Sequence, residues 1–162
     1  MILELPDDAL VIGLGGNVGG DAAIIERFRR AREALAQLGD VRAAPLYRTA
    51  PIGPAQADFL NTAVRVRYRD GTPAELIATI LELERLLGRE RRGEARGGPR
   101  AIDLDVLVWG TRQLRTPELE LPHPRLLARR FALEPLAELF EQARPLLARV
   151  ADQRCELVTT TW

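Results

Sequence analysis

The chain has 162 residues, with 23 basic and 23 acidic side chains and a formal net charge of +0. A balanced charge argues against a general nucleic-acid-binding protein, which usually carries an excess of basic residues. The composition is 46% hydrophobic and 28% charged. Such values are typical of a soluble protein with its own core, and we expect a single domain over residues 1–162.

The residue types that are missing exclude several kinds of catalysis. The chain has no Lys and no Ser, all 23 basic residues are Arg, and there is one His (His123) and one Cys (Cys155). A Schiff-base lysine, a P-loop lysine, a Ser-His-Asp triad and a structural zinc site are therefore excluded. A Cys–His pair stays open, although no nucleophile motif surrounds Cys155. The chemistry must use carboxylates, arginines and bound ions, with His123 as a further candidate.

The segment "MILELPDDAL" has neither a basic region nor a long apolar stretch, so we expect no signal peptide. No apolar run reaches the ~20 residues of a membrane span. We therefore expect a cytoplasmic protein without a membrane partner, and we take it to be a monomer.

A buried strand and an amphipathic helix come first along the chain. "ALVIGLGGN" (Ala9–Asn17) is a short apolar run that ends in glycines. From Asp21 to Leu38, apolar residues recur at helical spacing, and Gly39 ends the helix.

Two further strands follow this helix. Val41–Ala50 is read as a strand, and Pro45 favours an edge position because proline cannot donate to a neighbouring strand. Phe59–Arg69 is expected to be half exposed, because apolar residues alternate with arginines along Val64–Arg69.

A second helix begins with a capping signature, with Thr72 as N-cap, Pro73 next and Glu75 third, and Gly88 ends it. Ala101–Trp109 is the next strand, and the last third of the chain is read as helical fragments broken by prolines. The order strand, helix, strand, strand, helix, strand predicts an α+β fold. We expect a ferredoxin-like βαββαβ sandwich with a C-terminal helical extension.

Two acidic residues, Asp103 and Asp105, lie two positions apart in the last of these strands. Their side chains should point to the same face, about 6–7 Å apart. The apolar residues that alternate with them are expected to face the core: Ile102, Leu104, Val106 and Val108. The pair is either a solvated polar face or a ligand set for a hard cation such as Mg²⁺, which combines one or two carboxylates with phosphate oxygens.

The segment before the acid pair, "RLLGRERRGEARGGPR", is rich in arginine and glycine. Its arginines are Arg85, Arg89, Arg91, Arg92, Arg96 and Arg100. Guanidinium groups bind phosphate in a bidentate manner, and glycines let a loop move over a ligand. Alone, the segment reads as a solvated loop. Next to the acid pair, it indicates a site for the phosphates of a metal-bound nucleotide.

Two other regions are candidate parts of a site. His123, between two prolines, is either structural or a further phosphate contact. Asn61 offers both a donor and an acceptor, and Phe59 and Phe131 are candidate walls beside it. An amide between aromatic rings suits a flat heterocycle, but core aromatics with a turn asparagine explain the same residues.

Four motifs together resemble the 6-hydroxymethyl-7,8-dihydropterin pyrophosphokinase family of folate biosynthesis. They are "GLGGNVGG", "YRTAPIGPAQADFLNTAV", "GRERRGEARGGPRAIDLDVLVWG" and "LPHPRLLARRFALEPL", and they run in order from about Val11 to Leu136. The resemblance implies transfer of the β,γ-pyrophosphoryl group of ATP to the hydroxymethyl group of a reduced pterin, with release of AMP. It also implies a ferredoxin-like fold with three flexible loops, Mg²⁺ dependence, and small-molecule partners without nucleic acid.

The resemblance also implies a role for individual residues. Asp103 and Asp105 would bind two Mg²⁺ ions, and these two together with Arg89 and Arg100 would be catalytic. The expected ATP-binding residues are Glu84, Arg89, Arg91, Arg100, Val106, His123 and Arg129. The expected pterin-binding residues are Thr49, Ala50, Ile52, Phe59, Asn61 and Phe131.

This chain departs from the family pattern at three positions. Gly16 stands where the family usually has Ser, Phe59 where Tyr is common, and Gly97 where a Trp often precedes "GPR". That Trp helps to close the loop over the site, so loop closure is the property that the change at Gly97 puts in question.

Two other functions fit some of the same features. A different two-metal enzyme on this topology, such as a nucleotide cyclase or a nucleotidyl transferase, would use the same acid pair without binding pterin. An RNA-binding module of this fold would stack bases on exposed aromatic residues, but only 5% of this chain is aromatic.

Overall fold

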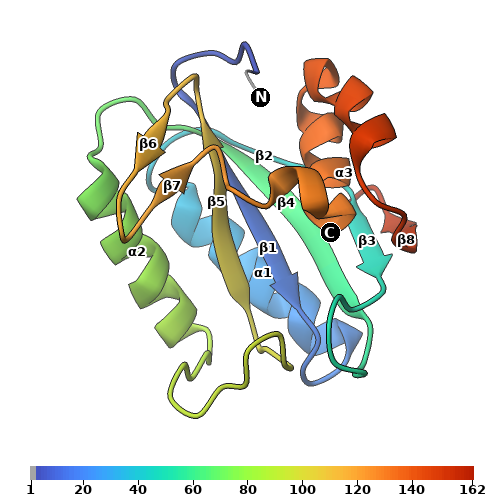
Figure 1. Cartoon of the computed structure of the whole chain (residues 1–162). Helices are drawn as coiled ribbons and strands as arrows, with labels where there is room; N and C mark the ends of the chain where they lie inside the picture. The colour runs from blue at the N-terminus through green and yellow to red at the C-terminus, as the bar shows by residue number, and fades with distance from the viewer. Residues whose placement is uncertain (1–2) are drawn as a thin grey trace.

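The computed structural model describes residues 3–162, so the first two positions of the expected domain lie outside the described residues. An antiparallel sheet forms the centre of the molecule, with strands in the order β5-β1-β4-β3-β8 (Figure 1). The strands of this order are β1 (Ala9–Gly16), β3 (Leu46–Thr49), β4 (Phe59–Arg67), β5 (Asp103–Trp109) and β8 (Cys155–Thr159). A further short strand, β2 (Val41–Ala43), pairs with β4. The model thus has the expected mixture of helices and antiparallel strands.

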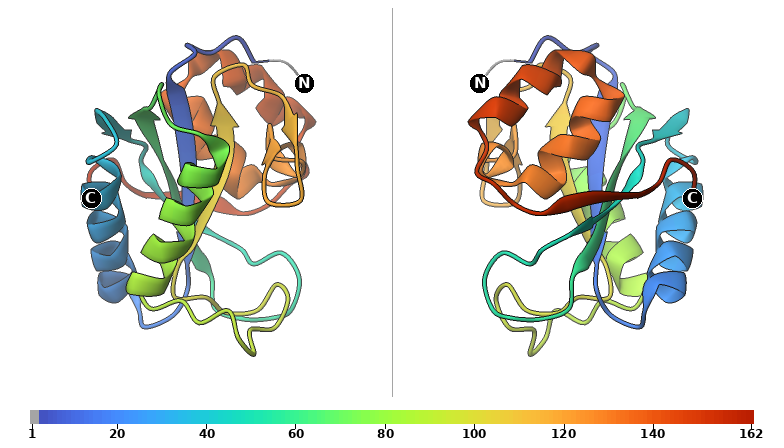
Figure 2. Two further views of the ribbon diagram at one scale, coloured as in Figure 1. Left: turned by 90° about the vertical axis from the view of Figure 1, so that its left-hand side faces the viewer. Right: turned by 90° about the vertical axis from the view of Figure 1, so that its right-hand side faces the viewer.

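Helices cover both faces of this sheet (Figure 2). One face carries α1 (Asp21–Leu35) and α2 (Pro73–Leu86), whose apolar sides contribute to one buried core. The other face carries α3 (Arg130–Leu139) and the 3-10 segment η2 (Glu141–Arg149), which contribute to a second core. Between them, the chain forms the small pair β6 (Leu114–Arg115) and β7 (Glu120–Leu121) and the short turn η1 (Leu126–Ala128).

The two predicted helices on the first face are confirmed. In α2, the Thr72 side chain accepts a hydrogen bond from the Glu75 backbone N–H at 3.2 Å, and the Glu75 carboxylate accepts one from the Thr72 N–H at 3.0 Å. This is the capping box that the sequence indicates. The helical residues of α1 end at Leu35, before the expected Leu38. Gly39 then lets the chain pass the sheet, since a Cβ there would lie 2.0 Å from the Arg67 carbonyl oxygen.

The expected strand Val41–Ala50 is divided into β2 and β3 around Pro45. The edge position predicted for it is wrong for β3, because β8 pairs with the outer side of that strand. The C-terminal extension is therefore not purely helical. It ends in a strand, and the indole N–H of Trp162 donates to the carbonyl oxygen of Ala44 at 2.8 Å, beside the break.

The strand β5 does not keep one alternation along its length. The pairing of β1 with β5 shifts between Val11 and Ile12, where Val11 lies opposite Val108 and Ile12 opposite Val106. A bulge of this kind reverses the faces of the residues beyond it. The prediction that Val108 faces the same core as Val106 is therefore wrong: Val106 lies in the core under α1 and α2, and Val108 lies in the core under α3. Asp103 and Asp105 precede the bulge, so they keep a common face.

Among the described residues, no helix has the length and apolar character that crossing a bilayer requires.

Candidate active site

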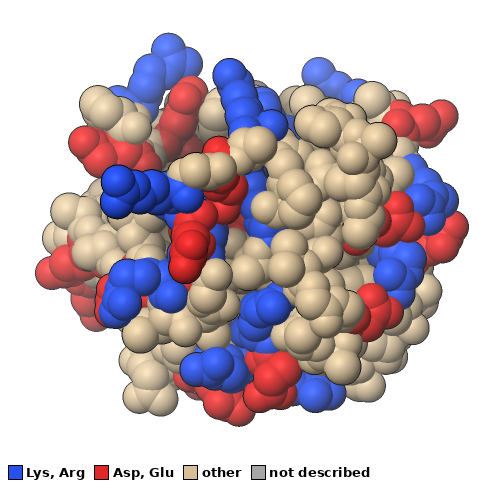
Figure 3. All heavy atoms as spheres, turned by 90° about the horizontal axis from the view of Figure 1, so that it is seen from below, with Lys and Arg blue, Asp and Glu red and all other residues tan. Residues whose placement is uncertain are grey.

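Three loops meet at the lower end of the sheet in Figure 1: the turn after β1, residues 50–58 and residues 87–102. Figure 3 shows the surface of the molecule from this side. On this surface, arginine and acidic side chains are interleaved. The register of the sheet explains the meeting point, because Gly15 of β1 lies opposite both Asn61 of β4 and Asp103 of β5. A Cβ at Gly15 would lie 2.6 Å from the Asn61 side-chain oxygen, so glycine leaves room for that amide.

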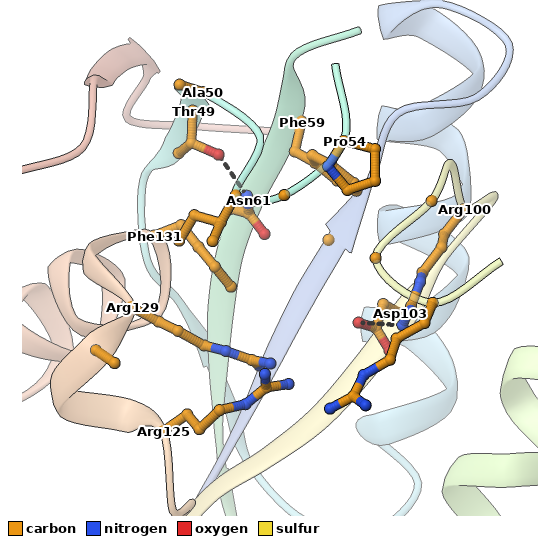
Figure 4. Close-up of a pocket in the computed structure, with 17 residues that line it drawn as sticks. Thr49, Ala50, Pro54, Phe59, Asn61, Arg100, Asp103, Arg125, Arg129 and Phe131 are labelled. Carbon is orange, nitrogen blue, oxygen red and sulfur yellow. Dashed lines mark hydrogen bonds and ion pairs between the residues drawn. The ribbon is translucent and has the colours of Figure 1, made fainter. Parts of the chain in front are cut away.

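A cavity of about 430 Å³ opens between these loops (Figure 4). All six residues expected to bind pterin line it: Thr49, Ala50, Ile52, Phe59, Asn61 and Phe131. The Asn61 amide is buried, and its N–H donates to the Thr49 hydroxyl oxygen at 2.7 Å, which fixes the orientation of the amide. An oriented amide beside two aromatic rings can recognise the hydrogen-bonding edge of a flat heterocycle.

A second cavity, of about 470 Å³, lies on the other side of β5. Ile77, Ile80 and Leu81 of α2 supply an apolar wall. Three of the residues expected to bind ATP also line it: Arg91, Val106 and His123. Arg91 is the arginine of this lining, which also includes the acidic residues Asp105, Glu118 and Glu120. An apolar wall near a guanidinium group suits an aromatic base that carries phosphates.

The acid pair lies between the two cavities. Asp103 lines the first and Asp105 lines the second. A ligand that occupies both cavities therefore has to pass the two carboxylates.

Arginines neutralise the acid pair in this structure. Asp103 accepts hydrogen bonds from Arg89 at 2.6 Å and from Arg100 at 3.2 Å, and Asp105 accepts one from Arg129 at 3.3 Å. Partial burial, followed by the negative charge of Asp103, raises the pKa of Asp105 to about 6. Desolvation and the charge of Asp103 thus both oppose ionisation of Asp105, and a cation beside the pair would favour it.

The donor set of this pair fits Mg²⁺. Two carboxylates from one strand leave several coordination positions for phosphate oxygens and water, which is how Mg²⁺ is usually held beside nucleotides. Within residues 3–162 there is no group of three or more His, Cys, Asp or Glu placed to hold a metal. An ion bound here would thus share its coordination with the substrate.

Glu84 lies beneath the site and lines neither cavity. Its carboxylate is 2% exposed and accepts hydrogen bonds from Arg89, from Arg91 at 2.6 Å and from the backbone N–H of Leu104 at 3.1 Å. Arg89 is 3% exposed and also pairs with Glu94 at 2.9 Å. Glu84 is thus placed to hold Arg89 and Arg91 rather than to touch a ligand directly.

His123 is partly buried at the rim of the second cavity. Burial, followed by the charges of Arg129 and Arg125, lowers the pKa of His123 to about 4. Its Nδ1 accepts a hydrogen bond from the backbone N–H of Arg125 at 3.1 Å. In the neutral ring the proton is then on Nε2, where it can donate to an anion.

Asn17 and Gln56 connect the three loops and were not predicted from the sequence. Asn17 donates to the Gln56 side chain at 3.0 Å and to the Ala57 carbonyl oxygen at 2.9 Å, and it accepts from the Arg100 N–H at 2.9 Å. Gln56 in turn donates to the Gly97 carbonyl oxygen at 2.7 Å. Both residues lie inside motifs that resemble the family, but the motifs alone do not show that the two side chains meet.

Known proteins resemble this chain both in sequence and in fold. The model of the family 7,8-dihydro-6-hydroxymethylpterin-pyrophosphokinase (HPPK) matches residues 11–141. A 2-amino-4-hydroxy-6-hydroxymethyldihydropteridine pyrophosphokinase of Synechocystis is 38% identical over 132 residues, which cover 80% of this chain and 65% of that protein. The protein of the same name in Bacillus subtilis is 36% identical over 132 residues, or 81% of this chain and 77% of that protein.

The solved structures that resemble this fold include the HPPK-DHPS protein of Plasmodium falciparum. The TM-score is 0.66 at 14% identity, over 90% of this chain and 43% of that one. The chain therefore spans less than half the length of this structural relative and about two thirds of the Synechocystis protein.

Proposed function

Because the chain belongs to the 7,8-dihydro-6-hydroxymethylpterin-pyrophosphokinase family, we propose that it transfers the pyrophosphoryl group of ATP to 6-hydroxymethyl-7,8-dihydropterin. The products are AMP and the pterin diphosphate, in the synthesis of folate. We further infer that the sheet is of the ferredoxin-like type and that the protein acts in the cytoplasm as a monomer.

The position of the acid pair between two cavities is the observation that carries this proposal. The pterin occupies the first cavity, with its polar edge on Asn61 and the backbone of residues 49–52, between Phe59 and Phe131. The adenine occupies the second cavity against α2. The triphosphate then crosses the acid pair, so that the hydroxymethyl oxygen faces the β-phosphorus.

The chemistry asks for positioning and charge compensation more than for covalent help from the protein. The pterin hydroxyl oxygen attacks the β-phosphorus, the bond from that phosphorus to the α,β-bridging oxygen breaks, and AMP leaves with that oxygen. The hydroxyl proton is released to water. Arg91, Arg100 and Arg129 are the cations that contact the phosphates, and His123 donates from its Nε2. Arg89 is 3% exposed and lines neither cavity, so it would reach the phosphates only on leaving Asp103.

We propose that Asp103 and Asp105 hold two Mg²⁺ ions together with the phosphates. Such ions supply charge neutralisation on the phosphate oxygens and orient the reacting groups. With such ions bound, the carboxylates would no longer need Arg89, Arg100 and Arg129 as their counterions. Those guanidinium groups are then available to the phosphates.

Product identity tests the proposed function. The protein is incubated with Mg²⁺, ATP and 6-hydroxymethyl-7,8-dihydropterin, and the products are separated and identified by mass and by phosphorus NMR. AMP and pterin diphosphate in equal amounts are expected. Release of pyrophosphate without a modified pterin would instead indicate a cyclase or nucleotidyl transferase.

A further inference from the structure

Arg125 lines the first cavity, although it is not among the site residues predicted from the sequence. It lies at the N-terminal end of η1, and Arg129 lies at the C-terminal end of the same turn. Both residues line the cavity that also holds Asn61 and Phe131. Figure 4 shows both arginine side chains extending from this turn into the cavity, with their guanidinium groups toward the same region.

The two arginines differ in their charge partners. Arg129 is paired with Asp105 at 3.3 Å. Arg125 is exposed, and within residues 3–162 no carboxylate lies at ion-pair distance from its guanidinium group. The positive charges of both residues lower the pKa of His123, which places them near one another and near that ring. Two neighbouring cations beside a neutral histidine leave positive charge without a partner in this structure.

An uncompensated guanidinium group that faces a cavity is suited to bind an anion in a bidentate manner. Arg125 shares the first cavity with Arg96, Arg100 and Arg129. Arg100 and Arg129 are paired with Asp103 and Asp105, whereas Arg125 is paired with neither aspartate. Arg91 and His123 line the second cavity, where the nucleotide is placed, whereas Arg125 and Arg129 line the cavity of the pterin. An anion that Arg125 binds in the first cavity lies beside the pterin, where the diphosphoryl group of the product would be.

We propose that Arg125 binds the diphosphoryl group after its transfer and so holds the pterin diphosphate product. This inference rests on the proposed function and extends it, because it assigns a binding residue for the product rather than for ATP. Arg125 then contributes little to the binding of the unmodified pterin, which has no phosphate. It contributes equally little to the binding of the nucleotide.

The variant Arg125→Ala tests this assignment directly. Its side chain is exposed, and the bond from its backbone N–H to His123 does not depend on the side chain, so the fold is expected to persist. Calorimetric titration is performed with the pterin diphosphate and, separately, with 6-hydroxymethylpterin. We expect the Kd for the diphosphate to rise about tenfold or more, and the Kd for the pterin to change less than about twofold.

Two further variants complete the experiment. Arg125→Lys keeps the charge but not the planar fork, so it should recover part of the affinity for the diphosphate. Arg29→Ala removes an exposed arginine of α1, away from both cavities, and should leave both affinities unchanged.

The outcomes separate this inference from the proposed function. If the wild-type protein binds the diphosphate and Arg125→Ala binds it equally well, the assignment of Arg125 is wrong while the proposed function stands. An equal loss of affinity for diphosphate and pterin would also overturn it, because that result indicates a structural role. If the wild-type protein forms no pterin diphosphate from ATP, the proposed function fails and this inference fails with it.

Discussion

Arg89 donates a hydrogen bond from Nη1 to Oδ1 of Asp103 at 2.6 Å, while its guanidinium group is buried against Glu84 and Glu94. A side chain of the acid pair is thus held by a buried arginine. Burial alone would lower the pKa of Arg89, but its bonds to Glu94 and the charges of Asp103 and Glu84 raise it. Arg89 therefore stays charged, and ligand binding has to exchange one counterion of Asp103 for another.

The acid pair should be needed for catalysis. We expect Asp103→Asn and Asp105→Asn each to lower kcat by about three orders of magnitude, equivalent to about 4 kcal/mol of transition-state stabilisation. The asparagine side chains keep the shape but not the charge that a divalent cation requires. Initial rates of AMP formation at saturating substrates measure the effect. Asp70→Asn, an exposed residue after β4, is the matched control and should keep the wild-type rate.

Glu84 should contribute to stability through the buried arginine. Removing one partner of a buried ion pair typically costs about 3 kcal/mol or more, because the other charge is left without compensation. We expect Glu84→Ala to lower the free energy of unfolding in urea by about that amount. Glu82→Ala is the control on the same helix, since Glu82 pairs with Arg85 at the surface. If both variants lose the same stability, the buried network is not the cause.

His123 should be neutral at pH 7. It is the only histidine of the chain, so its ring proton signal in an NMR titration needs no further assignment. We expect the signal to titrate near pH 4, because burial and the charges of Arg129 and Arg125 lower the pKa of His123 to about 4. Titration between pH 6 and 7, near the ordinary histidine value, would contradict the environment described here.

The same shift predicts a pH dependence of stability. The pKa of His123 lies below its ordinary value of 6.5, so the unfolded chain binds more protons than the folded one between pH 6.5 and about 4. Stability is lost as the pH falls through that window. Asp105 acts in the opposite direction, because its pKa is raised to about 6 and the folded state takes up the extra proton. The measurement is therefore the free energy of unfolding of the wild-type protein and of His123→Gln at each pH. The difference between the two values should shrink as the pH falls from 6.5 to about 4.

The hydrogen bonds of Gln56 that connect the loops should affect the binding of pterin more than the stability of the fold. Gln56→Ala removes the bonds to the side chain of Asn17 and to the carbonyl oxygen of Gly97. At about 1 kcal/mol for each bond, we expect the KM for pterin to rise about tenfold or more. Steady-state kinetics with pterin as the varied substrate provides the measurement. Gln142→Ala removes an exposed glutamine bonded to the Glu4 carbonyl oxygen and should have no such effect.

The connection matters here because Gly97 stands where the family often has a large aromatic residue. Gly97 has a φ of +71°, a left-handed conformation that favours glycine, and Gln56 binds its carbonyl oxygen. A hydrogen bond from residues 50–58 thus holds the arginine loop at the position where stacking of a tryptophan is missing. An unchanged KM for pterin in Gln56→Ala would show that the loops close without it.

The helices and most strands could be predicted from the sequence, because their periodicity and caps are local. The capping box at Thr72 and the apolar stripe of α1 involve residues three or four positions apart. The bulge in β5 could not be predicted, since it depends on how that strand pairs with β1. The strand β8 was missed for a similar reason: "CELVT" is short, and its partner β3 lies more than a hundred residues earlier.

The site, too, could be predicted where a local motif identifies a residue, and not where a role depends on contacts between distant segments. The resemblance to the family identified Asn61, Phe59 and Phe131, and the structure places all three around one cavity. It also named Glu84, but only the packing of α2 against β5 shows that this carboxylate lies beneath the arginines. Gln56 was missed because its hydrogen-bond partners lie on other loops. Arg125 was missed because, within residues 3–162, no carboxylate is paired with it. Such roles depend on the tertiary arrangement, so the motifs that contain these two residues do not reveal them.

The central claim is that Asp103 and Asp105 connect the cavities of the two substrates. Measuring how one substrate changes the binding of the other tests this claim most directly. A pterin analogue is titrated calorimetrically into the protein alone, and then into the protein with Mg²⁺ and a non-hydrolysable ATP analogue. The Mg²⁺-nucleotide complex is expected to increase the affinity for the pterin about tenfold or more, because it would occupy the acid pair and free the arginines to order the loops. Pterin affinity that does not respond to the nucleotide would contradict this claim.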